Sequence, residues 1–165
     1  MKKTIFIIFL FFALIFNARF VNAEEINYYQ TEITINTDGT INVTEKIEYD
    51  FGYLYRHGIF RDIPEIKTND EGKKYRMKFE DFSVVDQNEN RHKFEIIRKD
   101  NNIQLKIGDP DRTITGKNYY VISYKVSGAL TYFSDHDELY WNSIGTKWQV
   151  PINQAITLVN LPVKV

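Results

Sequence analysis

The chain contains no cysteine among its 165 residues. Disulfide bonds, thiol nucleophiles and cysteine-ligated metal sites are therefore excluded. Basic residues are not in excess either, because 21 lysines and arginines stand against 22 aspartates and glutamates. Binding of nucleic acid through bulk positive charge is thus not expected. The sequence also lacks internal repeats and any sustained 3.6-residue apolar period, which would predict long amphipathic helices.

The one long apolar run of the chain lies at its N-terminus. Lys2 and Lys3 precede twelve uninterrupted apolar residues, 5–16, and Val21-Asn22-Ala23 supplies the residues at −3 and −1 of a cleavage site. A helix of about 12 residues spans roughly 18 Å, which is shorter than the ~30 Å hydrocarbon core of a membrane. We therefore predict a cleavable secretory signal peptide over residues 1–23, with an uncleaved anchor as the alternative.

Cleavage would leave residues 24–165, which are 142 residues with 18 basic and 22 acidic side chains. That length suits one domain with its own core. No later stretch contains the ~18 apolar residues of a membrane-spanning helix. The β-rich pattern of residues 152–165 runs to the last residue without a polar tail. We therefore expect that the chain is a fragment of a longer protein.

The composition favours strands. Aromatic residues make up 15% of the chain, and Val, Ile and Thr are common, as in β-sheets. Asp38-Gly39 separates two alternating apolar runs, which predicts an antiparallel hairpin between residues 26–36 and 40–51. Further strands are predicted at residues 75–86, 92–99, 103–108, 118–127, 138–142, 148–151 and 153–163. About eight short strands with little helix predict an all-β fold, an antiparallel β-sandwich of immunoglobulin-like or jelly-roll-like type.

Residues 52–64 are predicted to form a loop rich in aromatic and basic residues, followed by a polar connection over residues 65–74. Arg56, His57 and Arg61 fall within six residues of this loop. Because arginine binds carboxylates and phosphates through paired hydrogen bonds, one interpretation is a recognition loop for an acidic group on a partner. The other interpretation, which we favour, is that Arg61 pairs with a nearby carboxylate and fixes the crossing between two sheets.

A second group of candidates lies in residues 134–142, where ionisable side chains directly precede an aromatic strand. Carboxylates around one histidine could ligate a metal or act as acid and base. They could also be the charge partner of the arginine loop, or a solvated loop next to packed aromatic residues. The binding candidates of the whole chain are accordingly Arg56, His57, Arg61, Asp137, Glu138, Tyr140, Trp141 and Asn142.

Calcium is the metal that the sequence could hold. Asp109 and Asp111 lie two residues apart in the turn-rich segment 108–116, and Asp135 is a third candidate. Carboxylate oxygens are calcium ligands, but Pro110 stiffens this segment and no glutamate follows at EF-hand spacing. Capping of the turn is the favoured alternative for the first two. No pattern in the sequence predicts a cofactor, a nucleophile elbow or a paired-carboxylate site.

Several motifs together resemble a known family. They are residues 38–45 (DGTINVTE), 56–64 (RHGIFRDIP), 107–111 (IGDPD) with Thr115-Gly116, and 138–142 (ELYWN) with Gly145 and Trp148. In this order, over residues 24–165, they are similar to the N-terminal extracytoplasmic domain of the predicted bacterial membrane proteins known as the domain of unknown function 2207 family. The resemblance implies transmembrane helices after this domain and a place in the cell envelope. It implies no known enzyme activity, so no catalytic residue is carried over.

These observations lead to one main hypothesis and two alternatives. The main hypothesis is a non-enzymatic module exported to the periplasm or the cell surface, which binds an envelope protein or polymer. The first alternative is a cell-wall or glycan hydrolase or binding domain that uses residues 135–138 near aromatic side chains. The second is a calcium-stabilised, adhesion-like module.

Overall fold

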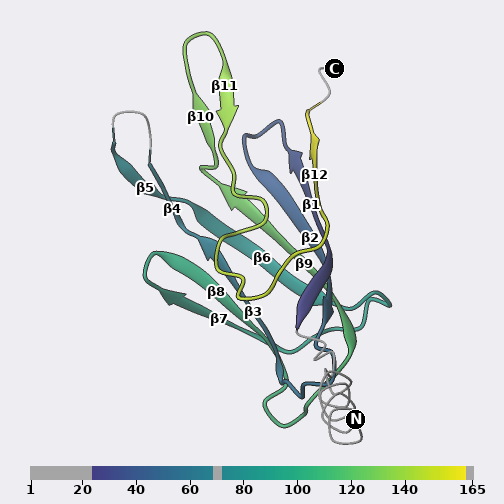
Figure 1. The fold of residues 1–165 in the computed structure, drawn as a ribbon. Helices are drawn as coiled ribbons and strands as arrows, with labels where there is room; N and C mark the ends of the chain where they lie inside the picture. The colour runs from purple at the N-terminus through teal and green to yellow at the C-terminus, as the bar shows by residue number, and fades with distance from the viewer. Residues whose placement is uncertain (1–23, 69–71, 163–165) are drawn as a thin grey trace, which may run out of the picture.

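The computed structural model describes residues 24–68 and 72–162. The predicted signal peptide and the C-terminal end of the chain, residues 163–165, lie outside the described residues. Within the described part every regular element is a strand, twelve in all (Figure 1). No membrane-crossing helix occurs among these residues. The all-β class predicted from the sequence is confirmed.

The larger sheet has five strands in the order β12-β1-β2-β9-β6. Period-two alternation explains how the strands other than β12, which is exposed along its whole length, form one buried face, since successive side chains of a strand point to opposite sides of the sheet. In β2 every second residue from Ile41 to Tyr49 is buried, and β9 buries Tyr120, Ile122, Tyr124 and Val126 in the same way. The strands are β1 (Glu25–Ile35), β2 (Ile41–Asp50), β6 (Lys78–Val85), β9 (Lys117–Ser127) and β12 (Ala155–Asn160).

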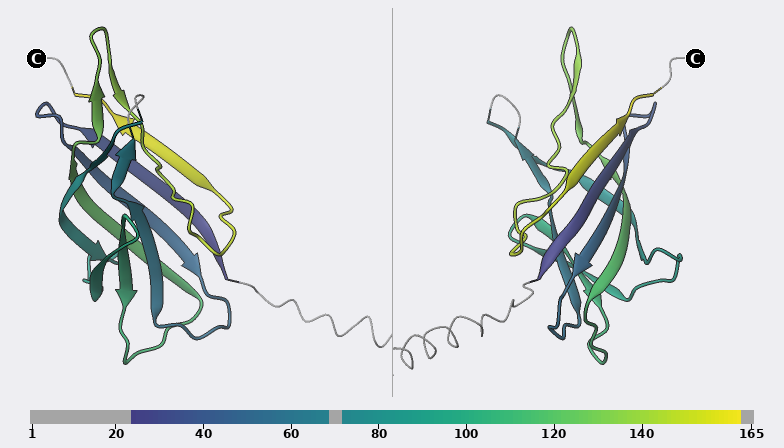
Figure 2. Two further views of the ribbon diagram at one scale, coloured as in Figure 1. Left: turned by 90° about the vertical axis from the view of Figure 1, so that its left-hand side faces the viewer. Right: turned by 45° about the vertical axis from the view of Figure 1, so that its right-hand side comes forward.

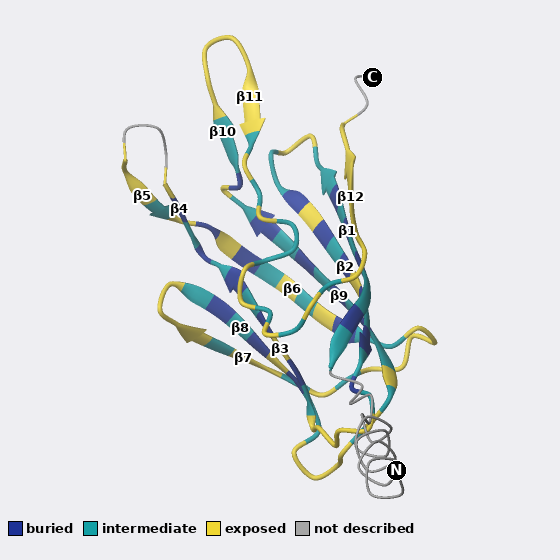
Figure 3. Ribbon diagram, in the orientation of Figure 1, coloured by how far each residue is buried: buried dark blue, intermediate teal, exposed yellow. Residues whose placement is uncertain are grey.

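The smaller sheet has three strands in the order β3-β8-β7, namely β3 (Gly58–Pro64), β8 (Asn102–Gly108) and β7 (Phe94–Lys99). Its inward residues include Ile59, Ile63 and Leu105, which belong to the same buried cluster as the inward residues of the larger sheet. The two sheets form separate layers (Figure 2), and buried positions recur along the strands of both except the edge strands β7 and β12 (Figure 3). The predicted β-sandwich is confirmed.

Two short hairpins extend the sandwich at one end. They are β4 (Ile66–Thr68) with β5 (Lys74–Arg76), and β10 (Leu130–Tyr132) with β11 (Asp137–Leu139). Both lie at the end opposite to the start of β1 (Figure 1). These hairpins account for most of the difference between the twelve observed strands and the eight or so that the sequence predicts.

The β1–β2 hairpin confirms the prediction made from Asp38-Gly39. The strands pair antiparallel up to Ile35 opposite Ile41. Gly39 has a φ of +80°, which is easy only for glycine. The Asp38 carboxylate accepts hydrogen bonds from the Thr40 amide at 3.0 Å and from the Thr40 hydroxyl at 2.6 Å, so the turn residues satisfy their own polar groups.

The structure corrects several other predictions. Residues 58–64 form a strand rather than the end of a loop, and residues 66–68 and 74–76 form a hairpin rather than a polar connection. No strand covers residues 148–151. The strand expected at residues 75–86 is divided at Met77. β12 pairs parallel with β1, because the chain first crosses over through residues 128–154, and parallel neighbours require such a long connection.

Candidate functional site

A buried ion pair joins the two sheets. Arg61 of β3 and Glu45 of β2 are 2% and 0% exposed. The guanidinium donates from Nε to Glu45 Oε2 at 2.7 Å and from Nη2 to Glu45 Oε1 at 2.8 Å, which is the paired geometry that arginine and carboxylate favour. Tyr29 and Tyr124 donate their hydroxyl hydrogens to the same two oxygens at 2.6 and 2.7 Å. Each oxygen of the Glu45 carboxylate therefore accepts two hydrogen bonds inside the core.

The protonation states of this network are held by its surroundings. Burial alone would lower the pKa of the Arg61 guanidinium, but the Glu45 carboxylate and the nearby phenols raise it above its ordinary value. Burial raises the pKa of the Tyr29 and Tyr124 hydroxyls, and the Glu45 charge raises it further. Arg61 thus stays charged and both phenols keep the hydrogens that they donate.

The position of Arg61 corresponds to the structural interpretation of the sequence, in which it pairs with a carboxylate and fixes the crossing between sheets. That carboxylate is Glu45. The alternative in which residues 135–138 are the charge partner of the arginine loop is wrong, because Arg56 also pairs elsewhere, with Glu24 at 2.5 Å. Asp137 and Glu138 instead lie on the exposed β11, opposite Tyr132 and Thr131 of β10.

Residues 140–148, which we call the pocket segment, pack against this ion pair. Gly145 has a φ of +87°, and a Cβ at this position would overlap the Arg61 guanidinium. The Gly145 amide donates to Asn142 Oδ1 at 2.8 Å, and Thr31 donates to the Ser143 carbonyl at 2.6 Å. The Trp148 ring meets that of Tyr29 edge-on, with centroids 5.9 Å apart. The buried pair therefore sets where this segment lies.

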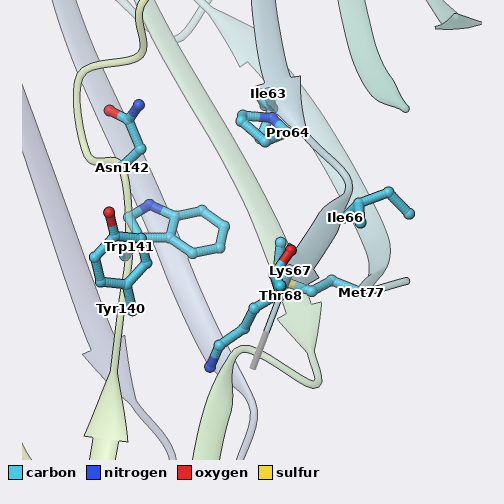
Figure 4. Close-up of a pocket in the computed structure, with 9 residues that line it drawn as sticks. All are labelled: Ile63, Pro64, Ile66, Lys67, Thr68, Met77, Tyr140, Trp141 and Asn142. Atoms are coloured by element: carbon cyan, nitrogen blue, oxygen red, sulfur yellow. The ribbon is translucent and has the colours of Figure 1, made fainter. Parts of the chain in front are cut away.

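The pocket segment forms one wall of a pocket of about 310 Å³. Tyr140, Trp141 and Asn142 line it from one side, and the end of β3 and the strand β4 line it from the other (Figure 4). The residues on that second side are Ile63, Pro64, Ile66, Lys67 and Thr68, together with Met77 between β5 and β6. Three of the candidates predicted from the sequence are thus brought together in one concave site.

The chemistry of this pocket is mainly apolar and aromatic. Trp141 packs against Phe79 and Tyr124, with ring centroids 6.2 and 6.5 Å apart. Tyr140 is 77% exposed. The Lys67 ammonium is buried and donates to the Ala129 carbonyl at 2.7 Å and to the Thr131 hydroxyl at 2.5 Å. Such a site can hold an apolar or aromatic group, with Tyr140 free to cover it.

The other basic candidates lie at the opposite end of the sandwich. Arg56 and His57 belong to the connection between β2 and β3 (Figure 1). The His57 Nδ1 atom is 3.2 Å from the Asp109 carbonyl and 3.1 Å from the Arg112 carbonyl. The structure therefore separates Arg56 and His57 from Tyr140, Trp141 and Asn142, while Arg61 contacts the pocket segment through Gly145.

The candidate calcium ligands are not gathered around a common point. Asp109 pairs with Lys93 at 2.5 Å and accepts from the Asp111 amide at 3.1 Å, as the turn-capping alternative expects. Asp135 instead contacts the neighbouring His136. Among residues 24–68 and 72–162, no group of three or more His, Asp or Glu side chains could hold a metal ion. The Lys93 hydrogen bond lowers the pKa of the Asp109 carboxyl, with the Asp111 amide contributing.

Replacing Lys93 with methionine will raise the pKa of Asp109 towards its ordinary value. The lysine is the main cause of the lowered pKa, and methionine keeps the length of the side chain without its charge. The measurement is an NMR titration of the carboxyl carbons. Lys117→Met is the matched control, because Lys117 lowers the pKa of Glu48 instead. An unchanged Asp109 pKa in the Lys93→Met protein would contradict the pairing.

Sequence reasoning missed Glu45, Tyr29 and Tyr124, which complete the buried network. One signal was available. Glu45 occupies the apolar register of β2, between Val43 and Ile47, where an inward charge requires a partner of opposite sign. Lys67 and Met77 carried no comparable signal, because their burial depends on the β4–β5 hairpin, which the sequence does not predict.

Comparison with known proteins gives one family match. The model of the family described as "Predicted membrane protein (DUF2207) N-terminal domain" matches residues 25–165. No curated protein sequence matches the chain.

Among solved structures, yeast LTA4 hydrolase has a TM-score of 0.44 at 8% identity, over 65% of this chain and 16% of that one. An M1 zinc metallopeptidase from Deinococcus radiodurans has a TM-score of 0.40 at 9% identity, over 67% of this chain and 22% of that one. The chain thus spans less than a quarter of the length of these enzymes. No functional argument follows from similarity at this level.

Proposed function

Because the chain belongs to the DUF2207 family of predicted membrane proteins, whose N-terminal domain it comprises, we propose that it is a non-enzymatic binding module. The module stands on the extracytoplasmic side of a membrane, in the periplasm or at the cell surface. It binds a protein or another envelope component through the pocket beside residues 140–142. The predicted signal peptide supports export, and family membership supports association with a membrane.

The observation that carries the binding role is the exposed aromatic side chain at the mouth of an apolar pocket. Tyr140 is 77% exposed, whereas the neighbouring Trp141 is packed on Phe79 and Tyr124. Exposed tyrosine next to a buried aromatic anchor is the composition found at protein-binding hot spots. The pocket segment is also fixed by the buried ion pair beneath it, so little ordering has to occur when a partner binds.

A binding role fits the pocket better than hydrolysis does. The candidate carboxylates Asp137 and Glu138 are exposed on β11 and do not line the pocket. Acid–base catalysis needs a carboxyl group within hydrogen-bond reach of the reacting atom. The pocket walls instead present aliphatic and aromatic carbon, which binds by excluding water.

Single cysteines placed in this cysteine-free chain test both parts of the proposal. Thr68→Cys and Tyr55→Cys are the matched pair, because Thr68 is exposed and lines the pocket, whereas Tyr55 is 71% exposed but lies in the β2–β3 connection at the other end. We expect a small charged maleimide, which passes through outer-membrane porins but does not cross the inner membrane, to label both variants in intact cells. We also expect labelling of Thr68→Cys in cells to be several-fold slower, relative to the purified protein, because a partner covers the pocket. Labelling of Tyr55→Cys should show no such difference.

The experiment can contradict the extracytoplasmic placement and the binding role independently of each other. If neither cysteine is labelled until the cells are permeabilised, the extracytoplasmic placement is wrong. If both are labelled in intact cells but Thr68→Cys shows no protection relative to Tyr55→Cys, the pocket is not occupied and the binding role fails.

A further inference from the structure

A second cavity lies at the opposite end of the sandwich from the pocket segment. Its volume is about 330 Å³. Three connections of the chain meet there: residues 51–57 between β2 and β3, residues 86–93 between β6 and β7, and residues 109–116 between β8 and β9. All three lie at the end where β1 begins (Figure 1). The cavity is therefore built from segments far apart in the sequence.

The lining of this cavity is strongly basic. It contains His57, Arg91, His92, Lys93 and Arg112. Asp109 is the single carboxylate among the described lining residues, and it is paired with Lys93. Within the described residues neither Arg91 nor Arg112 takes part in an ion pair. With both histidines neutral, the lining carries a net charge of +2 in a chain whose total is −1. Such a concave basic patch attracts anions.

Each of the two histidines has one ring nitrogen that is hydrogen-bonded and one that can contact a ligand. His57 Nδ1 is within hydrogen-bond distance of the Asp109 and Arg112 carbonyls, and His92 Nε2 is 3.1 Å from the Tyr119 carbonyl. A carbonyl oxygen only accepts, so these nitrogens carry hydrogen. The second nitrogen of each ring has no partner among the described residues, and it donates to an anion when the ring is protonated.

A buried hydroxyl gives an independent indication of a ligand. Tyr120 lines the cavity and is 1% exposed, yet its hydroxyl has no hydrogen-bond partner within the described part of the chain. The His92 ring packs on the Tyr120 ring, with centroids 4.9 Å apart. Buried hydroxyls are nearly always bonded, because an unpartnered one is costly. Burial raises the pKa of this phenol, so it keeps its hydrogen and can donate it.

We propose that this cavity binds a phosphate group, with Arg91, Arg112 and the Tyr120 hydroxyl as donors. Arginine matches the geometry of phosphate oxygens with two parallel hydrogen bonds. A phosphate group also offers these donors more oxygen acceptors than a single carboxylate does. A phosphomonoester, a phosphodiester polymer and a lipid headgroup all present this chemistry. The site is independent of the pocket beside residues 140–142, so the two proposals can fail separately.

The experiment measures binding to the purified full chain in detergent by calorimetry. The first probe is glycerol 3-phosphate, with glycerol and sodium chloride of matched ionic strength as blanks. The second is phosphatidylglycerol in mixed micelles with that detergent, compared with phosphatidylcholine in the same micelles. Binding of glycerol 3-phosphate indicates that the phosphate comes from a soluble or polymeric compound. Binding of phosphatidylglycerol alone indicates that it comes from a lipid headgroup. Either result supports the site. Failure of both probes up to about 10 mM ligand, far above useful affinity, overturns it.

Variants show whether the bound phosphate occupies this cavity. Tyr120→Phe should weaken binding about tenfold without lowering the melting temperature, because the hydroxyl has no partner to lose in the free protein. A purely structural hydroxyl would not give this combination. The double variant Arg91→Gln/Arg112→Gln should lose at least about tenfold. The control double variant Lys99→Gln/Lys147→Gln also removes two positive charges, but at exposed positions outside the cavity, and should leave binding unchanged. Unchanged affinity in Tyr120→Phe, or equal losses in the two double variants, would overturn the proposal.

Discussion

Replacing Glu45 with glutamine will lower the free energy of unfolding by about 3–5 kcal/mol, the cost of leaving one charge of a buried pair without its partner. Arg61 is 2% exposed and donates two hydrogen bonds to Glu45. Glutamine keeps the size of the side chain, so the loss comes from charge and hydrogen bonding rather than from a cavity. Urea denaturation monitored by tryptophan fluorescence measures the change.

The matched control is Glu80→Gln. Glu80 pairs with Lys78 on the surface, where the two side chains are 42% and 70% exposed. Removal of such a pair should cost at most about 1 kcal/mol. Equal losses in Glu45→Gln and Glu80→Gln would show that the buried pair contributes no more than a surface one.

A double-mutant cycle then separates pairing from other effects. Arg61→Met alone leaves the Glu45 charge buried with only the two phenols as donors. In Glu45→Gln/Arg61→Met neither charge remains, so the loss should be smaller than the sum of the two single losses by more than about 1 kcal/mol. Additive losses would contradict a direct interaction in solution.

Replacing Gly58 with alanine will also be strongly destabilising, by about 2–5 kcal/mol, because two costs add. Gly58 has a φ of +147°, a conformation that is strained for any other residue. A Cβ there would also overlap the Ile107 carbonyl on the neighbouring strand, and overpacking costs about 1–3 kcal/mol more. Gly58 lies directly opposite Gly108 where β3 and β8 pair, so the close approach depends on both glycines. Thermal and urea unfolding measure the loss.

Gly128→Ala separates these two costs. Gly128 has a φ of +79°, but a Cβ there would meet no atom within 4 Å. Only the conformational cost of about 1–2 kcal/mol is then expected. If Gly58→Ala is no more destabilising than Gly128→Ala, the close packing of β3 on β8 is not a constraint on the fold.

The sequence predicted those elements whose signals are local. Asp38-Gly39 between two alternating runs was sufficient for the β1–β2 hairpin and its register, because turn geometry and apolar alternation agree there. The long strand β9 was also predicted, and its buried positions alternate from Tyr120 to Val126.

The errors occurred where long-range pairing overrides the local pattern. β3 was predicted as a loop because Arg61 and Asp62 interrupt its apolar residues, and only Glu45 on a distant strand makes an inward arginine acceptable. The parallel docking of β12 could not be predicted, because it depends on the path of residues 128–154. The strand expected at residues 148–151 is absent because Trp148 instead packs on Tyr29 from the pocket segment.

In the candidate sites, too, residues with a local signal were predicted, and residues that depend on long-range contacts were not. Residues 140–142 were predicted as binding candidates from composition alone, and they do line a pocket. The opposite wall of that pocket was not predicted, because residues 65–74 were expected to form a polar connection rather than a hairpin. The basic cavity combines three loops, two of which the sequence singled out for other reasons. Tyr120, which lies in a regular strand, gave no sign of its unpartnered hydroxyl.

Hydrogen exchange of the Gly145 amide tests most directly whether the buried ion pair positions the pocket segment. Arg61→Lys keeps the charge but removes the planar group on which Gly145 packs. We predict that protection of the Gly145 amide, which donates to Asn142, falls by about tenfold or more through local opening. Protection of the Gly39 amide, which donates to Asn36 in the distant β1–β2 turn, should stay nearly unchanged. Unchanged protection at Gly145, or an equal loss at both amides, would contradict the account.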